Sequence, residues 1–209
     1  GVYVDIHPLA SPSGGGPIEF LISGSSDEYL DLNDTMLYVR GKVKKEDKTN
    51  LTDTAHIALS NIPLASFFSD VSVIINDRLV EGGNHLYPYK TYMSYLLRFN
   101  KEAVETHVRG TGFYKDEYGK MEDTEQRGFK ARKLLIAKSN TFEFCGSITL
   151  DIFQQSRYLL PNTDMRLKFL RHKSDFALIS HDKPMQGANP AIPAIKGIND
   201  IEESVLYVR

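Results

Sequence analysis

The sequence predicts a mostly β protein, an eight-stranded antiparallel β-sandwich of the jelly-roll type, with one or two short helices in its connecting loops. Several segments alternate apolar and polar residues with a period of two, which is typical of strands with one face in a core. Helical spacing is confined to a short part of the chain. The 209 residues, 41% of them hydrophobic, can bury a sizeable core. A jelly roll is a common arrangement of such long antiparallel strands.

Four strands are predicted in the first half of the chain. The first follows Pro17, and in the second the apolar residues Leu37, Val39 and Val43 share one face with Gly41. Two further strands flank Asn76-Asp77, a dipeptide that suits a tight hairpin turn. The predicted strands are therefore Ile18–Ile22, Leu37–Val43, Val71–Ile75 and Arg78–Val80.

The clearest alternation in the chain runs from Thr141 to Phe153. One face carries Phe142, Phe144, Gly146, Ile148, Leu150 and Ile152, and the residues between them form a largely polar face. We therefore predict one long strand over this stretch, in which Phe144, Ile148 and Leu150 are buried. A similar alternation over Met165–Phe169 predicts a further strand.

Two helices are predicted in the connections. Pro88 suits the first position of a helix over residues 88–99, and Tyr89, Tyr92, Met93 and Leu96 follow at helical spacing. We expect this face to lie on the sheet, with Tyr95 and Arg98 nearer to solvent. A second short helix is predicted over Lys101–Val108.

The two ends of the chain differ from its middle. Residues 1–16 end in Ser-Pro-Ser-Gly-Gly-Gly, which predicts a flexible arm before a domain over residues 17–180. Residues 181–200 contain three prolines and two glycines, and they predict an extended linker. A strand pattern then starts again, and its last letters, Leu-Tyr-Val-Arg at 206–209, repeat those at 37–40. Residues 201–209 are therefore expected to begin a truncated second jelly roll.

Composition excludes several classes of partner. The formal net charge is −2, so bulk charge does not favour a nucleic-acid partner. A single cysteine rules out an internal disulfide framework and fits a reducing compartment. No run approaches the roughly 18 apolar residues that a membrane-spanning helix needs.

No group of residues predicts catalysis, a cofactor or a metal. A zinc or iron site needs clustered imidazoles and carboxylates, whereas no two histidines stand at ligand spacing. Cys145 lies on the polar face of its predicted strand, without a His or Lys nearby in sequence, and we interpret it as an unreactive thiol. We therefore expect no enzyme and no cupin-like metal centre. The scattered histidines are His7, His56, His85, His107, His172 and His181.

Two stretches have the composition of binding surfaces. The first is a cluster of tyrosines within residues 87–95. It could stack on sugars, although rings at helical spacing more often pack in a core or a subunit interface. The basic stretch Arg127–Lys133 could meet nucleic acid, but acidic residues lie close by, so a solvated or intersubunit loop is favoured. The tyrosine cluster comprises Tyr87, Tyr89, Tyr92 and Tyr95.

Several stretches, in order from about residue 17 to 180, resemble one family. The chain is similar to the double jelly-roll major capsid proteins of polinton (Maverick) elements and adintoviruses. The segments that carry the resemblance are Pro17–Gly24, Tyr29–Asn33 with Leu37–Arg40, Tyr87–Tyr92, Phe113–Asp116, Arg132–Leu135 and Asp151–Leu160.

This resemblance implies a structural role in a virion. In that family one chain carries two consecutive jelly rolls, and three chains form a pseudo-hexameric capsomer of an icosahedral shell. The implied partners are a homotrimer, neighbouring capsomers and penton or minor capsid proteins. The present sequence departs from that pattern, because it is expected to hold only the first jelly roll, the linker and the start of the second. Half of the capsomer's contacts would then be missing, and this puts trimer formation in doubt. The alternative is a jelly-roll binding module that recognises glycans or another protein.

Overall fold

The computed structural model describes residues 1–24, 27–53, 55–120, 123–180 and 197–209. Its strands are β1 (Val4–Ile6), β2 (Ile18–Ile22), β3 (Met36–Lys45), β4 (Ile57–Leu59), β5 (Phe68–Ile75), β6 (Arg78–Glu81), β7 (Phe142–Ser147), β8 (Met165–Arg171), β9 (Leu178–Ser180) and β10 (Gly197–Val208). Its α-helices are α1 (Pro63–Ser66), α2 (Tyr87–Arg98), α3 (Lys101–Glu105), α4 (Arg127–Leu135) and α5 (Ser174–Ala177). Four 3-10 turns complete the described elements: η1 (Pro12–Gly14), η2 (His107–Thr111), η3 (Ala137–Ser139) and η4 (Asp151–Gln154).

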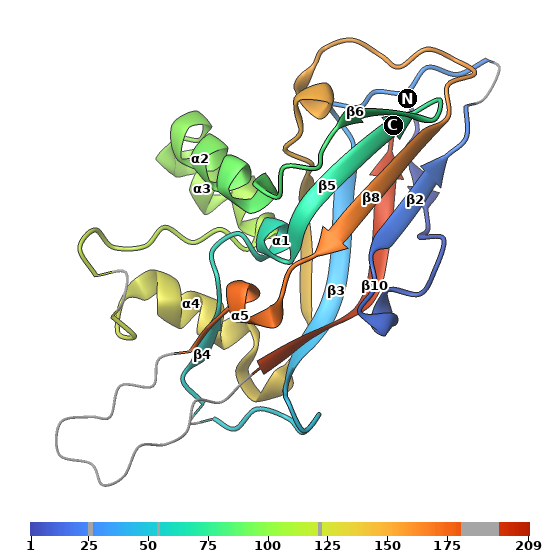
Figure 1. The fold of residues 1–209 in the computed structure, drawn as a ribbon. Coiled ribbons are helices and arrows are strands. Elements are labelled where there is room, and N and C mark those ends of the chain that lie inside the picture. Colours follow the sequence, from blue (N-terminus) through green and yellow to red (C-terminus); the bar gives the residue numbers. More distant parts are fainter. Residues whose placement is uncertain (25–26, 54, 121–122, 181–196) are drawn as a thin grey trace, which may run out of the picture.

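Eight of these strands form two four-stranded antiparallel sheets that face each other (Figure 1). One sheet has the order β1-β10-β3-β7 and the other the order β2-β8-β5-β6, while β4 and β9 pair in a small ribbon. If the eight sandwich strands are renumbered 1 to 8 along the chain, with β4 and β9 left out, the two sheets have the orders 1-8-3-6 and 2-7-4-5. The chain changes sheet at every step except the β5–β6 hairpin, which is the winding of a jelly roll. The predicted fold class is confirmed.

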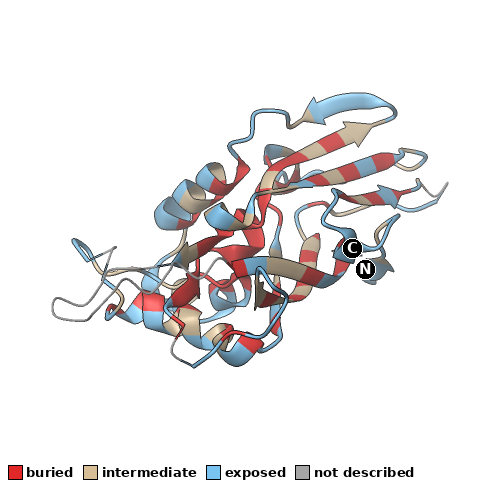
Figure 2. Ribbon diagram, turned by 60° about the horizontal axis from the view of Figure 1, so that its bottom comes forward, coloured by how far each residue is buried: buried red, intermediate tan, exposed pale blue. Residues whose placement is uncertain are grey.

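The core lies between the two sheets, and the inward-facing side chains of alternate strand residues fill it. Figure 2 shows buried and exposed residues alternating along the strands. Phe20 of β2 and Phe68 of β5 both contact Phe169 of β8, with ring centroids 5.8 and 5.1 Å from it. Aromatic rings at these distances and tilted angles stabilise a core beyond the area that they bury.

The last strand, β10, lies inside the first sheet. It pairs with β1 on one side and β3 on the other, and Leu206 stands opposite Leu37. The two Leu-Tyr-Val-Arg segments thus occupy neighbouring antiparallel strands, and both leucines are buried. The prediction that residues 201–209 begin a separate sheet is wrong, because they supply the apolar face that completes this one. The wider division into a first and a second jelly roll stays a prediction, and residues 181–196 of the predicted linker lie outside the described residues.

Regular structure also occurs within residues 1–16, where we expected a flexible arm. Val4 stands opposite Val208 and Ile6 opposite Leu206, so β1 covers the outer edge of β10. Pro12, in η1, is buried. An uncovered strand edge exposes unpaired backbone groups, and pairing with β1 removes that exposure along part of β10.

The close approach of β3 and β10 depends on Gly41. A Cβ atom at this position would lie only 2.4 Å from the carbonyl oxygen of Asp200. The pairing register shifts next to it, between Ile201 and Glu203, which marks an irregularity of the β-bulge kind. Glycine therefore occupies the place in β3 where the bulged strand comes nearest.

The long strand predicted over 141–153 is shorter than expected. β7 ends at Ser147, and η4 begins at Asp151. Phe144, Ile148 and Leu150 are buried as predicted, but Thr149 between the last two is buried as well, so the alternation has ended. The Glu81 carboxylate accepts hydrogen bonds from the backbone N–H groups of residues 151 and 152, at 3.1 and 3.3 Å. These bonds hold the chain in a turn in place of a continued strand.

The hairpin between β5 and β6 is confirmed. Asn76 and Asp77 have φ values of 44° and 63°, and both central residues of a type I′ turn require positive φ. The predicted strands over β2, β3 and β8 are also present. Local alternation and turn chemistry were enough to place these elements.

Helix α2 has almost the predicted bounds, but it presents a different face to the protein. Tyr95 is buried, with its ring centroid 5.0 Å from Phe99 and 5.9 Å from Phe113. Tyr89, Met93 and Leu96 are exposed, although we expected them on the sheet. The helix contacts one end of β5 and the segment around Phe113, so these contacts select the buried face. The second predicted helix is divided into α3 and η2.

Candidate interaction surfaces and the buried network beside them

The basic stretch at 127–133 forms helix α4, although we expected a loop. Arg132 of this helix is only 1% exposed, and its Nη1 lies 2.9 Å from Oδ1 of Asp116. Its Nε donates to the carbonyl oxygen of Leu59 at 2.9 Å. A Cβ atom at Gly128 would lie 2.4 Å from the same Asp116 oxygen, so glycine leaves room for the pair. Arg132 therefore forms a buried ion pair inside the protein and cannot contact nucleic acid.

Two amides complete this buried network. The Asn61 side chain donates to the carbonyl oxygen of Tyr114 at 2.7 Å and to Asp116 at 3.2 Å, and its own oxygen accepts from the Tyr114 N–H at 3.1 Å. Gln126 donates to Asp116 at 2.8 Å and accepts from the Glu117 N–H at 3.2 Å. The network fixes the segment 113–117 against α4 and the β4 ribbon.

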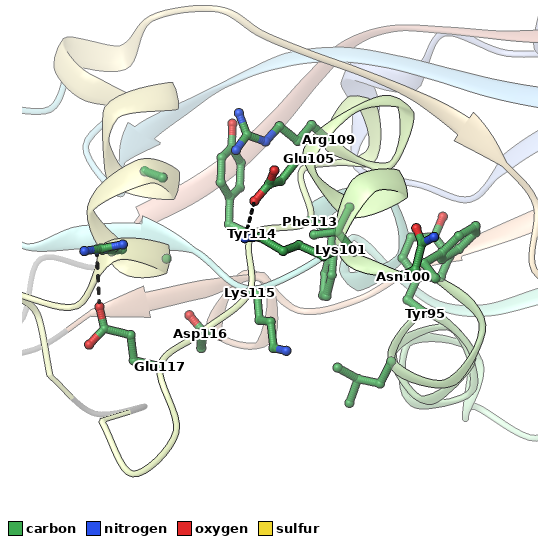
Figure 3. Close-up of a pocket in the computed structure, with 16 residues that line it drawn as sticks. Tyr95, Asn100, Lys101, Glu105, Arg109, Phe113, Tyr114, Lys115, Asp116 and Glu117 are labelled. Carbon is green, nitrogen blue, oxygen red and sulfur yellow. Dashed lines mark ion pairs between the residues drawn. The ribbon is translucent and has the colours of Figure 1, made fainter.

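An open groove of about 870 Å³ runs along this fixed segment. The C-terminal part of α2, helix α3, residues 113–117 and α4 line it (Figure 3). Its aromatic residues are Tyr95, Phe99, Phe113 and Tyr114. At its rim, Lys101 lies 4.0 Å from Glu105 and Arg127 lies 3.9 Å from Glu117, while the Arg109 guanidinium is 5.8 Å from the centroid of the Tyr114 ring.

The tyrosine cluster does not form a common stacking surface. Tyr87 and Tyr95 are buried. The ring of Tyr89 meets Phe176 edge-on at 5.6 Å, and Tyr92 meets Phe113 at 6.4 Å. Since two of the four rings are buried and the other two pack against phenylalanines, the interpretation as packing residues fits the structure better than a sugar platform.

Helix α2 carries a stripe of exposed apolar side chains. Leu97 is 81% exposed, and the other members are between 44% and 56% exposed. Among the described residues, no helix combines the length and apolar character needed to cross a bilayer. The stripe, made of Leu86, Tyr89, Met93, Leu96 and Leu97, is a candidate contact surface for another protein.

Among the described residues, which exclude His181, the histidines and Cys145 are not brought together into a site. In the described part of the chain, no three His, Cys, Asp or Glu side chains are grouped as a metal site requires. The ring of His172 stacks on Phe176, and burial lowers the pKa of that histidine. Burial also raises the pKa of the half-buried Cys145 thiol, which disfavours the reactive thiolate. The expectation of no metal and no catalytic residue stays a prediction.

The fold defined by these sheets is similar to part of two virus capsid structures. The crystal structure of the mavirus major capsid protein superposes with a TM-score of 0.57 at 10% sequence identity, over 99% of this chain and 46% of that one. The PBCV-1 virus capsid, in a quasi-atomic model, superposes with a TM-score of 0.52 at 14% identity, over 99% of this chain and 40% of that one. At such identities the similarity shows the fold alone.

One curated relative is similar in sequence. The uncharacterized protein F54H12.2 of Caenorhabditis elegans is 25% identical in an alignment of 179 residues, and the alignment covers 82% of this chain and 41% of the relative. No family model matches the chain. The chain thus spans less than half the length of each of these three proteins.

Proposed function

We propose that this chain is a structural subunit of a virus-type capsid, of the polinton or adintovirus kind. The observation that carries the proposal is the strand order 1-8-3-6 facing 2-7-4-5, in a fold that superposes on the mavirus major capsid protein over 99% of the chain. The two sheets enclose one continuous hydrophobic core. Such a core suits a shell protein.

In the finer form of the proposal, the chain is one of two jelly rolls in a longer polypeptide. It matches 40–46% of the length of the two capsid proteins, a share that one of two similar domains would occupy. Three copies of the longer chain would form a pseudo-hexameric capsomer, which would meet neighbouring capsomers and penton or minor capsid proteins in the virion. The exposed stripe of α2 supports a protein contact of this kind.

The proposed role is not enzymatic. The buried charged pair, Arg132 with Asp116, is occupied by internal hydrogen bonds that hold one segment in place. The alternative, a jelly roll that recognises glycans, has less support, because the four tyrosines do not share a surface.

Electron microscopy of a longer chain tests the proposal. A polypeptide that contains residues 1–209 and a following domain of about 200 residues would be purified and imaged in negative stain. We expect compact particles with a hexagonal outline, built from three chains. Uniform single-chain particles across the accessible concentration range would contradict the capsid role.

A further inference from the structure

The groove beside α4 has a rigid wall before any ligand binds. Its segment 113–117 is held from behind by the buried pair of Arg132 and Asp116 and by the amides of Asn61 and Gln126. These bonds join α4, the β4 ribbon and the groove segment into one unit. A pre-formed site loses less conformational entropy on binding than one that must become ordered.

The rim of the groove has positive charge that the protein itself does not neutralise. Lys115 is exposed, and no ion pair of the described residues includes it. The Arg109 guanidinium makes a cation–π contact with the Tyr114 ring, 5.8 Å from the ring centroid. Lys101, whose side chain is 87% exposed, only reaches 4.0 Å from Glu105. In Figure 3 these three cations come from α3, η2 and the fixed segment, around one opening.

Each acidic residue at the rim has an ion-pair partner within the protein. Asp116 pairs with the buried Arg132, and Glu117 pairs with Lys120 at 3.3 Å and with Arg127 at 3.9 Å. Glu105 has only its weak, exposed pair with Lys101. The charge left for a ligand is therefore positive and concentrated at Lys115 and Arg109.

Behind the cations the groove is aromatic and apolar. Phe113 and Tyr95 form its buried floor, at 2% and 7% exposed. The apolar side chains that a ligand can reach are Leu96, which is 44% exposed, and the half-buried Phe99 and Val104. Apolar surface of this kind can hold one large side chain, and the cations can then meet acidic groups on either side of it.

We propose that this groove binds a short acidic peptide segment of another protein, anchored by one aromatic or large aliphatic side chain. Charge complementarity and the apolar wall select this occupant. A nucleic acid fits less well, because the apolar wall of the groove offers no charged partner to a continuous run of phosphates. The proposal does not depend on the capsid role, since a binding module of any kind could use such a groove.

Fluorescence anisotropy with a defined probe tests the proposal. The probe is a fluorescein-labelled peptide of about eight residues with four glutamates around one phenylalanine, titrated with the purified chain. We expect a Kd on the order of 10⁻⁵ to 10⁻⁴ M at low salt, which weakens as sodium chloride rises from about 50 to about 500 mM. A peptide with alanine in place of phenylalanine, and one with lysines in place of glutamates, should both bind at least about fivefold more weakly.

Matched variants locate the binding. Lys115→Glu and Arg109→Gln should each weaken binding of the acidic peptide by about fivefold or more, because each removes a cation from the rim. Arg157→Glu changes an exposed cation outside the groove, so its binding should stay within about twofold of the unchanged chain. Absence of saturable binding, equal losses in all three variants, or tighter binding of a thymidine oligonucleotide of the same charge would each overturn the proposal.

Discussion

The residues that hold the interior together include one buried ion pair. Arg132 and Asp116 are 1% and 13% exposed at their side chains, and each has hydrogen bonds to further partners. A buried pair of this kind contributes little compared with apolar packing. Removal of one partner is nevertheless costly, since the other charge is left without compensation.

Arg132→Ala should therefore lower the free energy of unfolding by about 3–5 kcal/mol. The neighbouring Lys130 provides a matched control, because its pair with Glu125 is exposed, with side chains 53% and 74% accessible. Lys130→Ala should change stability by less than about 1 kcal/mol. Urea unfolding followed by circular dichroism gives both values, and similar losses in the two variants would show that the buried network is unimportant.

His172 gives the protein a pH dependence with a defined sign. Burial lowers the pKa of this histidine from its ordinary value of 6.5. The unfolded state then takes up the proton first as pH falls, so the free energy of unfolding should decrease below pH 6.5 and level off below the folded-state pKa.

The variant His172→Phe isolates this effect, because a phenyl ring can stack on Phe176 but cannot titrate. The stability of the unchanged chain should fall more steeply between about pH 7.5 and pH 5 than that of the variant. Urea unfolding curves at several pH values measure the difference. Parallel pH profiles would contradict the expected role of His172.

At the scale of elements, strand β10 contributes most clearly to the stability of the first sheet. It lies between β1 and β3 at the centre of one sheet, and its Leu206 is fully buried. A central strand carries two ladders of backbone hydrogen bonds as well as its side-chain packing. The fold of the preceding residues therefore depends on a segment that follows a Pro- and Gly-containing stretch.

Leu206→Asp should destabilise the chain by several kcal/mol, on the order of 4 kcal/mol, because it buries an unpaired carboxylate. Ile198→Asp tests the same strand at a position that is 37% exposed and opposite Lys44. That variant should cost less than about 1 kcal/mol. Thermal unfolding of the two proteins measures the contrast, and a harmless Leu206→Asp would mean that β10 is not part of the folded sheet.

Local sequence patterns predicted most strands, whereas they could not predict which distant strands pair with one another. Alternation over β2, β3 and β8, and the Asn-Asp turn, depend on neighbouring residues and were visible in the sequence. The partner of β10 was not, because cross-strand neighbours such as Arg40 and Glu203 are 163 positions apart. The repeated letters Leu-Tyr-Val-Arg were a true signal of similar environments in adjacent strands, but repetition alone does not distinguish pairing from a second domain.

The candidate groove could not be predicted from the sequence for a related reason. Its wall comes from α2, α3, the segment 113–117 and α4, and no local sequence pattern indicates that these separate stretches meet. Helix α4 has only nine residues, contains Gly128 and leaves Leu134 71% exposed, so it has no clear apolar stripe. The burial of Arg132 depends on Asp116 and Leu59, which come from other parts of the chain.

For the whole molecule, the core between two four-stranded sheets accounts for stability, and the connections between strands carry the candidate contact surfaces. The long connection between β6 and β7 contains α2, α3 and α4, and with them both the apolar stripe and the groove. Loops on a rigid sandwich can vary without loss of the core. This division suits a shell protein whose neighbours are specified by its connections.

The mass of the assembled protein tests the capsid account most directly. Light scattering would compare residues 1–209 with a chain extended by a domain of about 200 residues, at matched concentrations up to tens of micromolar. We predict a monomer or a weak, polydisperse associator for residues 1–209 and discrete trimers for the extended chain, because stable trimers need large repeated interfaces. An extended chain that stays monomeric throughout this range would contradict the account.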